Sequence, residues 1–182
     1  MLNDIEIRHL WDYQSRLDDT IESRLLSKLL WDYCYSNKFQ KVISEKESFV
    51  HDSIAMNKDA DEQVLYFIVD FLFHCGIDNV ETLRYTFHSG YCLYFARMLK
   101  DAFNRGEVCW AAPFGHFVWK DENGVCYDVE GVTISEAEYF IPESYLGDAI
   151  KDFLHVRWVG NDTSAEEIQQ IISKYKEDRG EY

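Results

Sequence analysis

Cys92, His116 and Asp128 follow one another along the chain, and their residue types together are suited to thiol chemistry. Cys92 comes two residues after Gly90 and begins a stretch with helical periodicity. A thiol at the start of a helix lies beside unpaired backbone amides and the positive end of the helix dipole, and both stabilise the reactive thiolate. The same amides can bind the oxyanion that develops when a thiolate attacks a carbonyl group. The sequence therefore predicts Cys92 as a nucleophile.

His116 is the candidate base, because imidazole titrates near neutral pH. A β-hairpin is expected after it, with the turn Asp121-Glu122-Asn123-Gly124. Asp in the first position and Gly in the fourth favour a type I turn followed by a left-handed glycine. This loop pairs the first turn residue with Val125, and the resulting register places Val118 opposite Asp128.

Strand alternation then places the side chains of the hairpin on two faces. One face is apolar, with Phe117, Trp119, Tyr127 and Val129, and the other holds His116, Val118, Cys126, Asp128 and Glu130. Glu130 lies opposite His116, and Asp128 is its diagonal neighbour, with Cα atoms about 7–8 Å apart and within reach of a hydrogen bond. A carboxylate there would fix the imidazole tautomer and stabilise the imidazolium. Asp128 is the preferred partner of His116, and Glu130 is the alternative.

The combined pattern resembles the transglutaminase-like branch of the papain-like fold. It consists of a Gly-x-Cys that begins a helix, an alanine four residues later, a strand that starts with histidine, and an aspartate on the next strand. It is also similar to papain-fold toxin and deamidase domains, and it covers residues 88–132. The resemblance implies that Cys92 is the nucleophile, His116 its base and Asp128 the residue that orients the histidine. Transglutaminase-like domains usually show His-Ala-Trp and Asp-Pro, whereas this chain has His116-Phe117-Val118-Trp119 and Asp128-Val129.

The chain is expected to form a single α+β domain over residues 1–182. A hydrophobic fraction of 47% in 182 residues can bury a core, and only two prolines occur. The expected core is papain-like and transglutaminase-like, with the cysteine-bearing helix packed on a small antiparallel sheet, and it occupies residues 76–160. A helical part at residues 1–75 precedes it, and a C-terminal helix and tail at residues 161–182 follow.

Hydrophobic periodicity and capping signals predict the individual elements. Helices are expected from Ile7 to Leu30, at 38–52, at 59–75 before Gly76, at 91–103, in a short segment after Pro142, and from Thr163 or Ser164 onward. Ser164 and Glu167 fit a capping box. Two or three strands are expected between Glu107 and Val132 and one at 153–159, and residues 76–90 are expected to be irregular.

Composition limits the classes of function. The formal net charge of −15 and the lack of a basic stripe argue against direct nucleic-acid binding. The longest apolar stretch, Val64 to Phe73, is interrupted by Asp70 and is too short to cross a bilayer, so no membrane partner is expected. Five cysteines, an odd number, together with the lack of an export signal indicate free thiols and a cytoplasmic location.

These features favour a cysteine-dependent enzyme that acts on a protein or peptide amide by hydrolysis, deamidation or transamidation. Such chemistry requires no cofactor. The alternative is a non-catalytic binding protein on the same scaffold, such as a phage or mobile-element factor that sequesters a host protein or ligand. A third hypothesis is an acidic mimic of nucleic acid, which the net charge suggests.

A structural zinc site is a further interpretation of the same segment. Its ligands would be His88, Cys92, Cys109 and His116. No Cys-x-x-Cys pair is present and the spacing does not match known zinc motifs, so no metal is expected. His88, Gly90 and Tyr91 are instead expected to line the site, with Tyr91 as a wall or an oxyanion contact.

Overall fold

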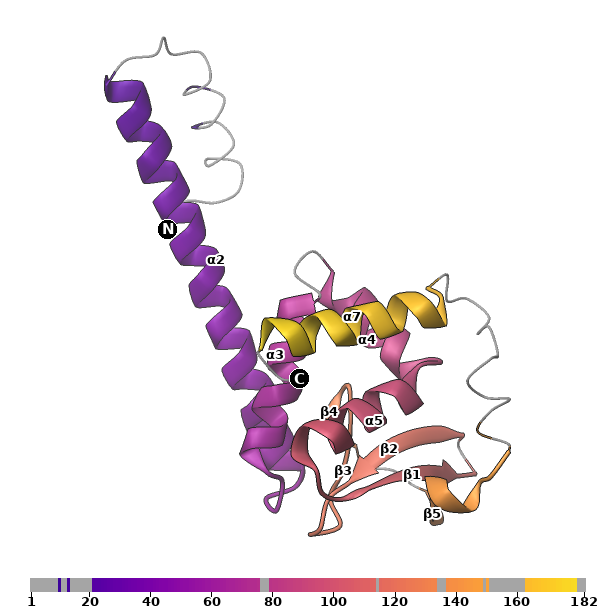
Figure 1. Ribbon diagram of the computed structural model, residues 1–182. Helices are drawn as coiled ribbons and strands as arrows, with labels where there is room; N and C mark the ends of the chain where they lie inside the picture. Colours follow the sequence, from indigo (N-terminus) through magenta and orange to yellow (C-terminus); the bar gives the residue numbers. More distant parts are fainter. Residues whose placement is uncertain are drawn as a thin grey trace. The chain divides into compact units, whose positions relative to one another are not determined.

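The computed structural model describes residues 10, 13, 21–75, 79–113, 115–133, 137–148, 150 and 163–179. Its contacts divide the chain into two compact units, residues 1–45 and residues 46–182. The prediction of a single domain over the whole chain stays a prediction. The second unit contains the sheet and all the candidate site residues, and its elements are labelled in Figure 1.

One long helix, α2, spans Ile21–Met56, with residues 21–45 in the first unit and residues 46–56 in the second. The prediction of two separate helices, the second at 38–52, is therefore wrong. No glycine or proline interrupts residues 30–38, so the helix continues through them. Most of the predicted first helix before Ile21 lies outside the described residues. No helix among the described residues is long and apolar enough to cross a membrane.

Two shorter helices follow, α3 at Glu62–Cys75 and α4 at Val80–His88. Helix α3 ends at Cys75 as predicted, and its expected cap, Gly76, lies outside the described residues. The prediction that residues 76–90 are irregular is wrong, because α4 occupies most of them. The Asn79 side chain caps this helix by accepting a hydrogen bond from the Thr82 N–H at 2.9 Å. Helix α4 matters for the site because His88 is its last residue.

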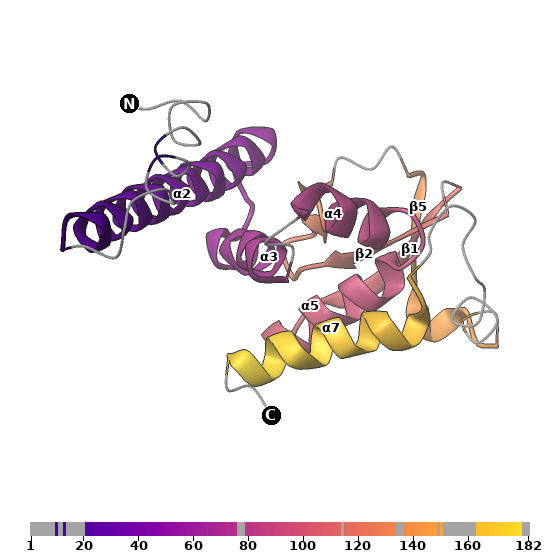
Figure 2. The ribbon, with the colours of Figure 1, turned by 90° about the horizontal axis from the view of Figure 1, so that it is seen from above.

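Helix α5 spans Cys92–Phe103, close to its predicted limits, and packs on a sheet that has five strands (Figure 2). The strands are β1 at Glu107–Ala112, β2 at His116–Lys120, β3 at Cys126–Asp128, β4 at Gly131–Val132 and β5 at Tyr139–Pro142. Their order is β4-β3-β2-β1-β5, and every neighbouring pair is antiparallel. Four strands occur where two or three were predicted, and β5 was not predicted. Strand β4 has two residues and β5 has four, so both are too short for an alternating pattern to be recognised in the sequence.

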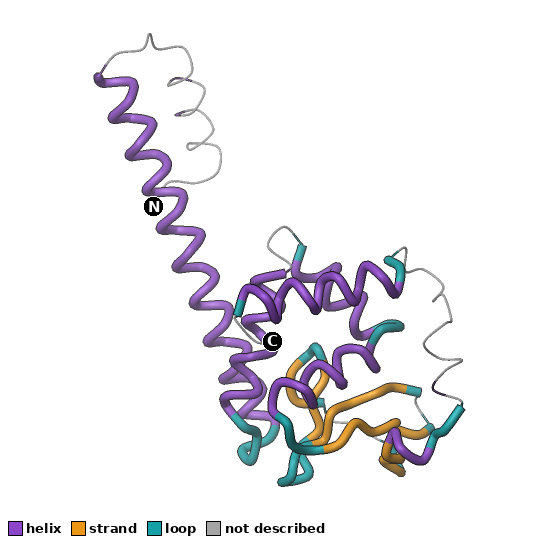
Figure 3. Tube along the Cα trace, in the orientation of Figure 1, coloured by secondary structure: helices purple, strands orange, loops and turns teal. Residues whose placement is uncertain are grey.

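The C-terminal part begins with a 3₁₀ helix, η1, at Glu143–Tyr145, which confirms the short helix predicted after Pro142. Helix α7 at Ala165–Asp178 follows, and Figure 3 shows it among the helices that accompany the sheet. Its predicted capping box is confirmed, because Ser164 and Glu167 exchange hydrogen bonds. The predicted strand at 153–159 lies outside the described residues. The described part of the chain is α+β, as predicted.

Apolar residues fill both faces of the sheet. The main core lies between α5 and the sheet and includes side chains of α3 and α7. Phe117 and Trp119 of β2 belong to this core, whereas the residue between them, Val118, belongs to a second small cluster with Cys109 and Cys126. From Phe117 to Trp119, successive side chains therefore point to opposite faces of the sheet, as the sequence predicts.

The hairpin between β2 and β3 has the register expected from its turn. Trp119 pairs with Tyr127, and the Asp121 N–H donates to the Val125 carbonyl oxygen at 2.9 Å. Gly124 has a φ of +85°, the left-handed conformation that this turn requires. The carboxylate of Asp121 also accepts the Val125 N–H at 2.8 Å, which stabilises the turn. The predicted register is confirmed.

Candidate functional site

Four side chains that can do chemistry meet beside the N-terminus of α5, and each comes from the end of a different element. His88 is the last residue of α4 and Cys92 is the first residue of α5. His116 begins β2, and Asp128 ends β3. Regular elements therefore hold the backbone of all four residues, which limits how far their side chains can move apart.

Cys92 occupies the first turn of α5. Tyr91 is the N-cap residue, and its side chain makes no capping hydrogen bond. The first backbone amides of the helix are therefore not capped by the Tyr91 side chain. The sulfur accepts a hydrogen bond from the Phe117 N–H at a donor–acceptor distance of 3.4 Å. The sulfur thus lies beside a backbone donor and a helix N-terminus, which are surroundings typical of reactive cysteines. The residue is 4% exposed.

His116 is held by a carboxylate. Its Nε2 nitrogen lies 2.8 Å from Oδ2 of Asp128, as expected for diagonal neighbours in the hairpin register. The side chains of His116 and Asp128 are 19% and 5% exposed, so water screens the pair weakly. The other oxygen of Asp128 accepts the Glu130 N–H at 2.7 Å, which fixes the orientation of the carboxylate.

The surroundings of His116 strongly favour the protonated, positively charged form of its imidazole. Burial acts to lower the pKa of His116, but hydrogen bonds to Asp128 and to the Cys92 sulfur, with the negative charge of both groups, outweigh it and raise the pKa to about 10. Because Nε2 faces Asp128, Nδ1 is the ring nitrogen left for the sulfur. At neutral pH the arrangement is therefore an imidazolium between two acceptors.

Glu130, the alternative orienting residue, has a different partner. Its Oε2 lies 3.4 Å from Nε of Arg84 in α4. Burial raises the pKa of Glu130, Arg84 opposes this, and the negative charge of Asp128 adds to it. The structure thus brings Asp128, and not Glu130, into hydrogen-bond contact with His116.

His88 is the fourth residue of the group and lies on the side that is exposed to solvent. Its Nδ1 lies 3.7 Å from Oδ2 of Asp128, and its ring centroid lies 4.9 Å from that of His116. The side chain is 51% exposed, in contrast to the buried Asp128. His88 therefore lines the site, as the sequence suggests, and also contacts the same carboxylate oxygen as His116.

The zinc ligand set considered for the sequence is not assembled. Cys109 lies with Val118 and Cys126 in the small cluster on the sheet face away from α5. Burial raises the pKa of Cys109, and it raises the pKa of Cys126 to about 11. Both thiols are therefore poor ligands and poor nucleophiles near neutral pH.

Tyr91 and Gly90 shape the approach to Cys92. The Tyr91 hydroxyl donates to the Thr163 carbonyl oxygen at 2.5 Å, which ties the start of α5 to the segment before α7. This bond engages the hydroxyl of Tyr91, the residue that was expected to contribute a wall or an oxyanion contact. Gly90 is buried and has a φ of +149°, a backbone conformation that residues other than glycine rarely adopt.

Three contributors to the site were missed from the sequence. They are the Phe117 amide, Arg84 as the partner of Glu130, and Thr163 as the partner of Tyr91. The N-cap signal at Asn79 could have revealed α4 and hence the placement of Arg84 and His88 on one helix. The other two are contacts of backbone atoms, for which residue types carry no signal.

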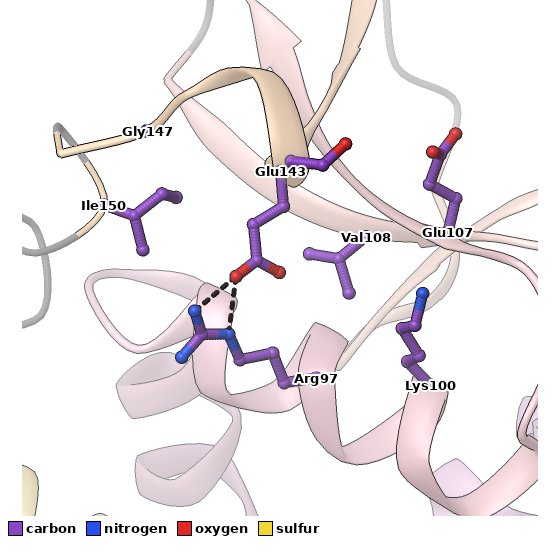
Figure 4. A pocket seen from close by; sticks show the side chains of 8 residues that line it. Arg97, Lys100, Glu107, Val108, Glu143, Gly147 and Ile150 are labelled. Atoms are coloured by element: carbon purple, nitrogen blue, oxygen red, sulfur yellow. Dashed lines mark hydrogen bonds and ion pairs between the residues drawn. The ribbon is translucent and has the colours of Figure 1, made fainter.

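A separate pocket of about 530 Å³ lies where α5, β1 and η1 meet (Figure 4). Arg97 and Glu143 form an ion pair in it, with Arg97 Nε 2.9 Å from Glu143 Oε1. Lys100 and Glu107 also line it. No cysteine or histidine is among the described residues that line this pocket, so the Cys92 group is the stronger candidate site for thiol chemistry.

Comparisons of the chain with protein-family models, with curated proteins and with solved structures gave no match.

Proposed function

We propose that this protein is a cysteine-dependent enzyme that transfers the acyl group of a protein or peptide amide, with Cys92 as nucleophile. The observation that carries the proposal is that one imidazole, His116, interacts with both the Cys92 sulfur and the Asp128 carboxylate. A nucleophile, a base and an orienting group in contact are the arrangement that thiol acyl transfer needs. The proposal includes a papain-like core, since α5 carries the cysteine and packs on an antiparallel sheet.

The first half of the reaction forms a thioester. The Cys92 thiolate attacks the amide carbonyl carbon, a carbon–sulfur bond forms, and negative charge moves to the carbonyl oxygen. The Cys92 and Leu93 amides in the first turn of α5 are the candidate donors for that oxyanion, since the Tyr94 and Phe95 N–H groups donate to the Tyr91 carbonyl oxygen. The His116 imidazolium gives its proton to the amide nitrogen, and the carbon–nitrogen bond breaks to release an amine or ammonia.

The second half returns the enzyme to its starting state. Neutral His116 takes a proton from a water molecule, whose oxygen attacks the thioester carbon and expels the Cys92 thiolate. The products are a carboxylic acid and the original thiolate–imidazolium pair. An amine in place of water would give a new amide, which is transamidation. Asp128 holds Nε2 of His116 throughout, which leaves Nδ1 as the nitrogen that exchanges protons with the reactants.

Selective alkylation tests the nucleophile. Iodoacetamide is chosen because it is a small reagent and Cys92 is only 4% exposed. At pH 6 we expect Cys92 to be alkylated at least about tenfold faster than a model thiol, because only the thiolate reacts and a free thiol has a pKa of about 8.5. Adducts are mapped by peptide mass spectrometry.

Cys75 and Cys126 provide internal controls in the same sample, because burial raises the pKa of each to about 11. They should remain unmodified at pH 6, and Cys92→Ala should lose the fast adduct. Alkylation of Cys92 no faster than the model thiol would contradict the proposal.

The near burial of Cys92 favours one alternative, a binding protein that uses the same scaffold without catalysis. Its partner would be a sequestered protein or ligand. Cys92→Ala distinguishes the two functions, because it should abolish an enzyme's effect on its target and leave a binding protein's effect intact. Retention of the effect with Cys92→Ala supports the binding protein.

A further inference from the structure

Three metal-ligating side chains converge at the exposed edge of the candidate site. His88, His116 and Asp128 each present one ligand atom, and within the described residues these atoms all lie within 4.8 Å of one another. They come from α4, β2 and β3. Two imidazoles and one carboxylate are a ligand set used for Zn²⁺ and Fe²⁺ in proteins.

The distances are close to those of a zinc site. Zinc bonds of about 2.0–2.2 Å to nitrogen and oxygen place tetrahedral ligand atoms about 3.4 Å apart. Oδ2 of Asp128 lies 2.8 Å from Nε2 of His116 and 3.7 Å from Nδ1 of His88, on either side of that value. Two of the three separations are therefore within about 0.6 Å of the zinc value, and the third, between the ligand nitrogens of the two histidines, is at most 4.8 Å.

The surroundings of the three ligands also suit a cation. The Glu130 N–H holds Oδ1 of Asp128 and leaves Oδ2 directed at both histidines, which is the kind of outer contact that orients metal ligands. Glu130 itself acts electrostatically on His88 and Asp128 and adds negative charge, with Arg84 as the opposing cation. Because the His88 side chain is 51% exposed, an ion can enter from solvent and keep a water ligand.

We propose that His88, His116 and Asp128 form a binding site for a divalent transition-metal ion, with Zn²⁺ as the representative ion, and that the bound metal suppresses the reactivity of Cys92. The ion binds Nε2 of His116 in place of the hydrogen bond to Asp128. His116 is then held as a metal ligand, and Asp128 no longer orients its ring for the reaction at the sulfur. The suppression rests on the proposed function, whereas the metal site does not.

Calorimetric titration of the reduced full-length chain with Zn²⁺ tests the metal site. We expect wild type to bind one ion at this site and His88→Ala to weaken binding by about tenfold or more. His51→Ala is the matched control, because His51 is an exposed histidine whose Nδ1 lies 3.5 Å from an oxygen of Asp52. It should bind as wild type does.

Cys92→Ala excludes the competing explanation that the sulfur is the ligand, and it should keep the affinity of wild type. The metal-site inference is overturned if wild type and His88→Ala bind Zn²⁺ equally, or if Cys92→Ala abolishes binding. Circular dichroism of each variant verifies that it is folded.

Alkylation of Cys92 with and without Zn²⁺ tests the suppression. We expect saturating Zn²⁺ to slow the reaction of wild type about tenfold, a chelator to restore it, and His88→Ala to be insensitive. Zinc binding to a chain whose Cys92 is unreactive would reject the proposed function and keep the metal site. A reactive Cys92 with no zinc binding would reject the metal site alone.

Discussion

Oδ2 of Asp128 lies 2.8 Å from Nε2 of His116 although the two residues stand on different strands and are not paired across the ladder. The hairpin register makes them diagonal neighbours, and the Glu130 N–H turns the carboxylate toward the ring. The charge of His116 therefore depends on a contact that the turn of the hairpin establishes.

Asp128→Asn should lower the pKa of His116 from about 10, because the substitution removes the charge that the ring faces. The expected decrease is about one to three pH units. Titration of the His116 ring by NMR measures it. Glu130→Gln is the control and should leave this pKa close to that of wild type, because Glu130 pairs with Arg84. Equal shifts in both variants would assign the orienting role to neither residue.

Stability should depend on pH through His116. Its pKa is raised in the folded state, so its contribution to the free energy of unfolding is fully present below about pH 6.5 and is lost as the pH rises through about 10. Urea unfolding of wild type and of His116→Gln at several pH values measures this. The stability difference between them should be largest near pH 6 and should shrink toward pH 10. A difference that grows with pH would contradict the raised pKa.

Gly131→Ala should destabilise the fold by about 1–3 kcal/mol. Gly131 has a φ of +99°, and a Cβ atom there would lie 2.5 Å from Oγ of Ser53. Gly147→Ala is a matched control, because Gly147 has a φ of +53° but no atom within 4 Å of the added carbon. Gly147→Ala should lower the free energy of unfolding by about 1 kcal/mol, because only the strain of the left-handed backbone conformation contributes. Urea unfolding compares the two, and equal losses would show that the close approach to Ser53 has no energetic weight.

Asn79→Ala should destabilise the protein by about 1 kcal/mol, because it removes the acceptor for the Thr82 N–H at the start of α4. Asn79→Ser should retain most of the stability, since serine also caps helices. Thermal unfolding monitored by circular dichroism measures both. The same loss with alanine and serine would mean that the cap does not stabilise α4.

The elements around the site show how far local signals reach. The turn at Asp121–Gly124, the alternation along β2 and the capping box at Ser164 were recognised from the sequence, because each depends on residues close together along the chain. Helix α4 was missed because its nine residues hold only one helical repeat of large buried apolar residues, Leu83 with Phe87, although Asn79 marks its start. The two-residue strand β4 gave no pattern to detect.

By itself, the sequence determined the order of Cys92, His116 and Asp128, the α+β class and the register that brings the last two together, because backbone sterics and strand period act locally. Only the tertiary structure decided that the Phe117 amide meets the sulfur, that His88 reaches Asp128 and that Glu130 turns to Arg84. Those contacts join α4, α5 and the sheet, and packing of the shared apolar core sets where these elements meet.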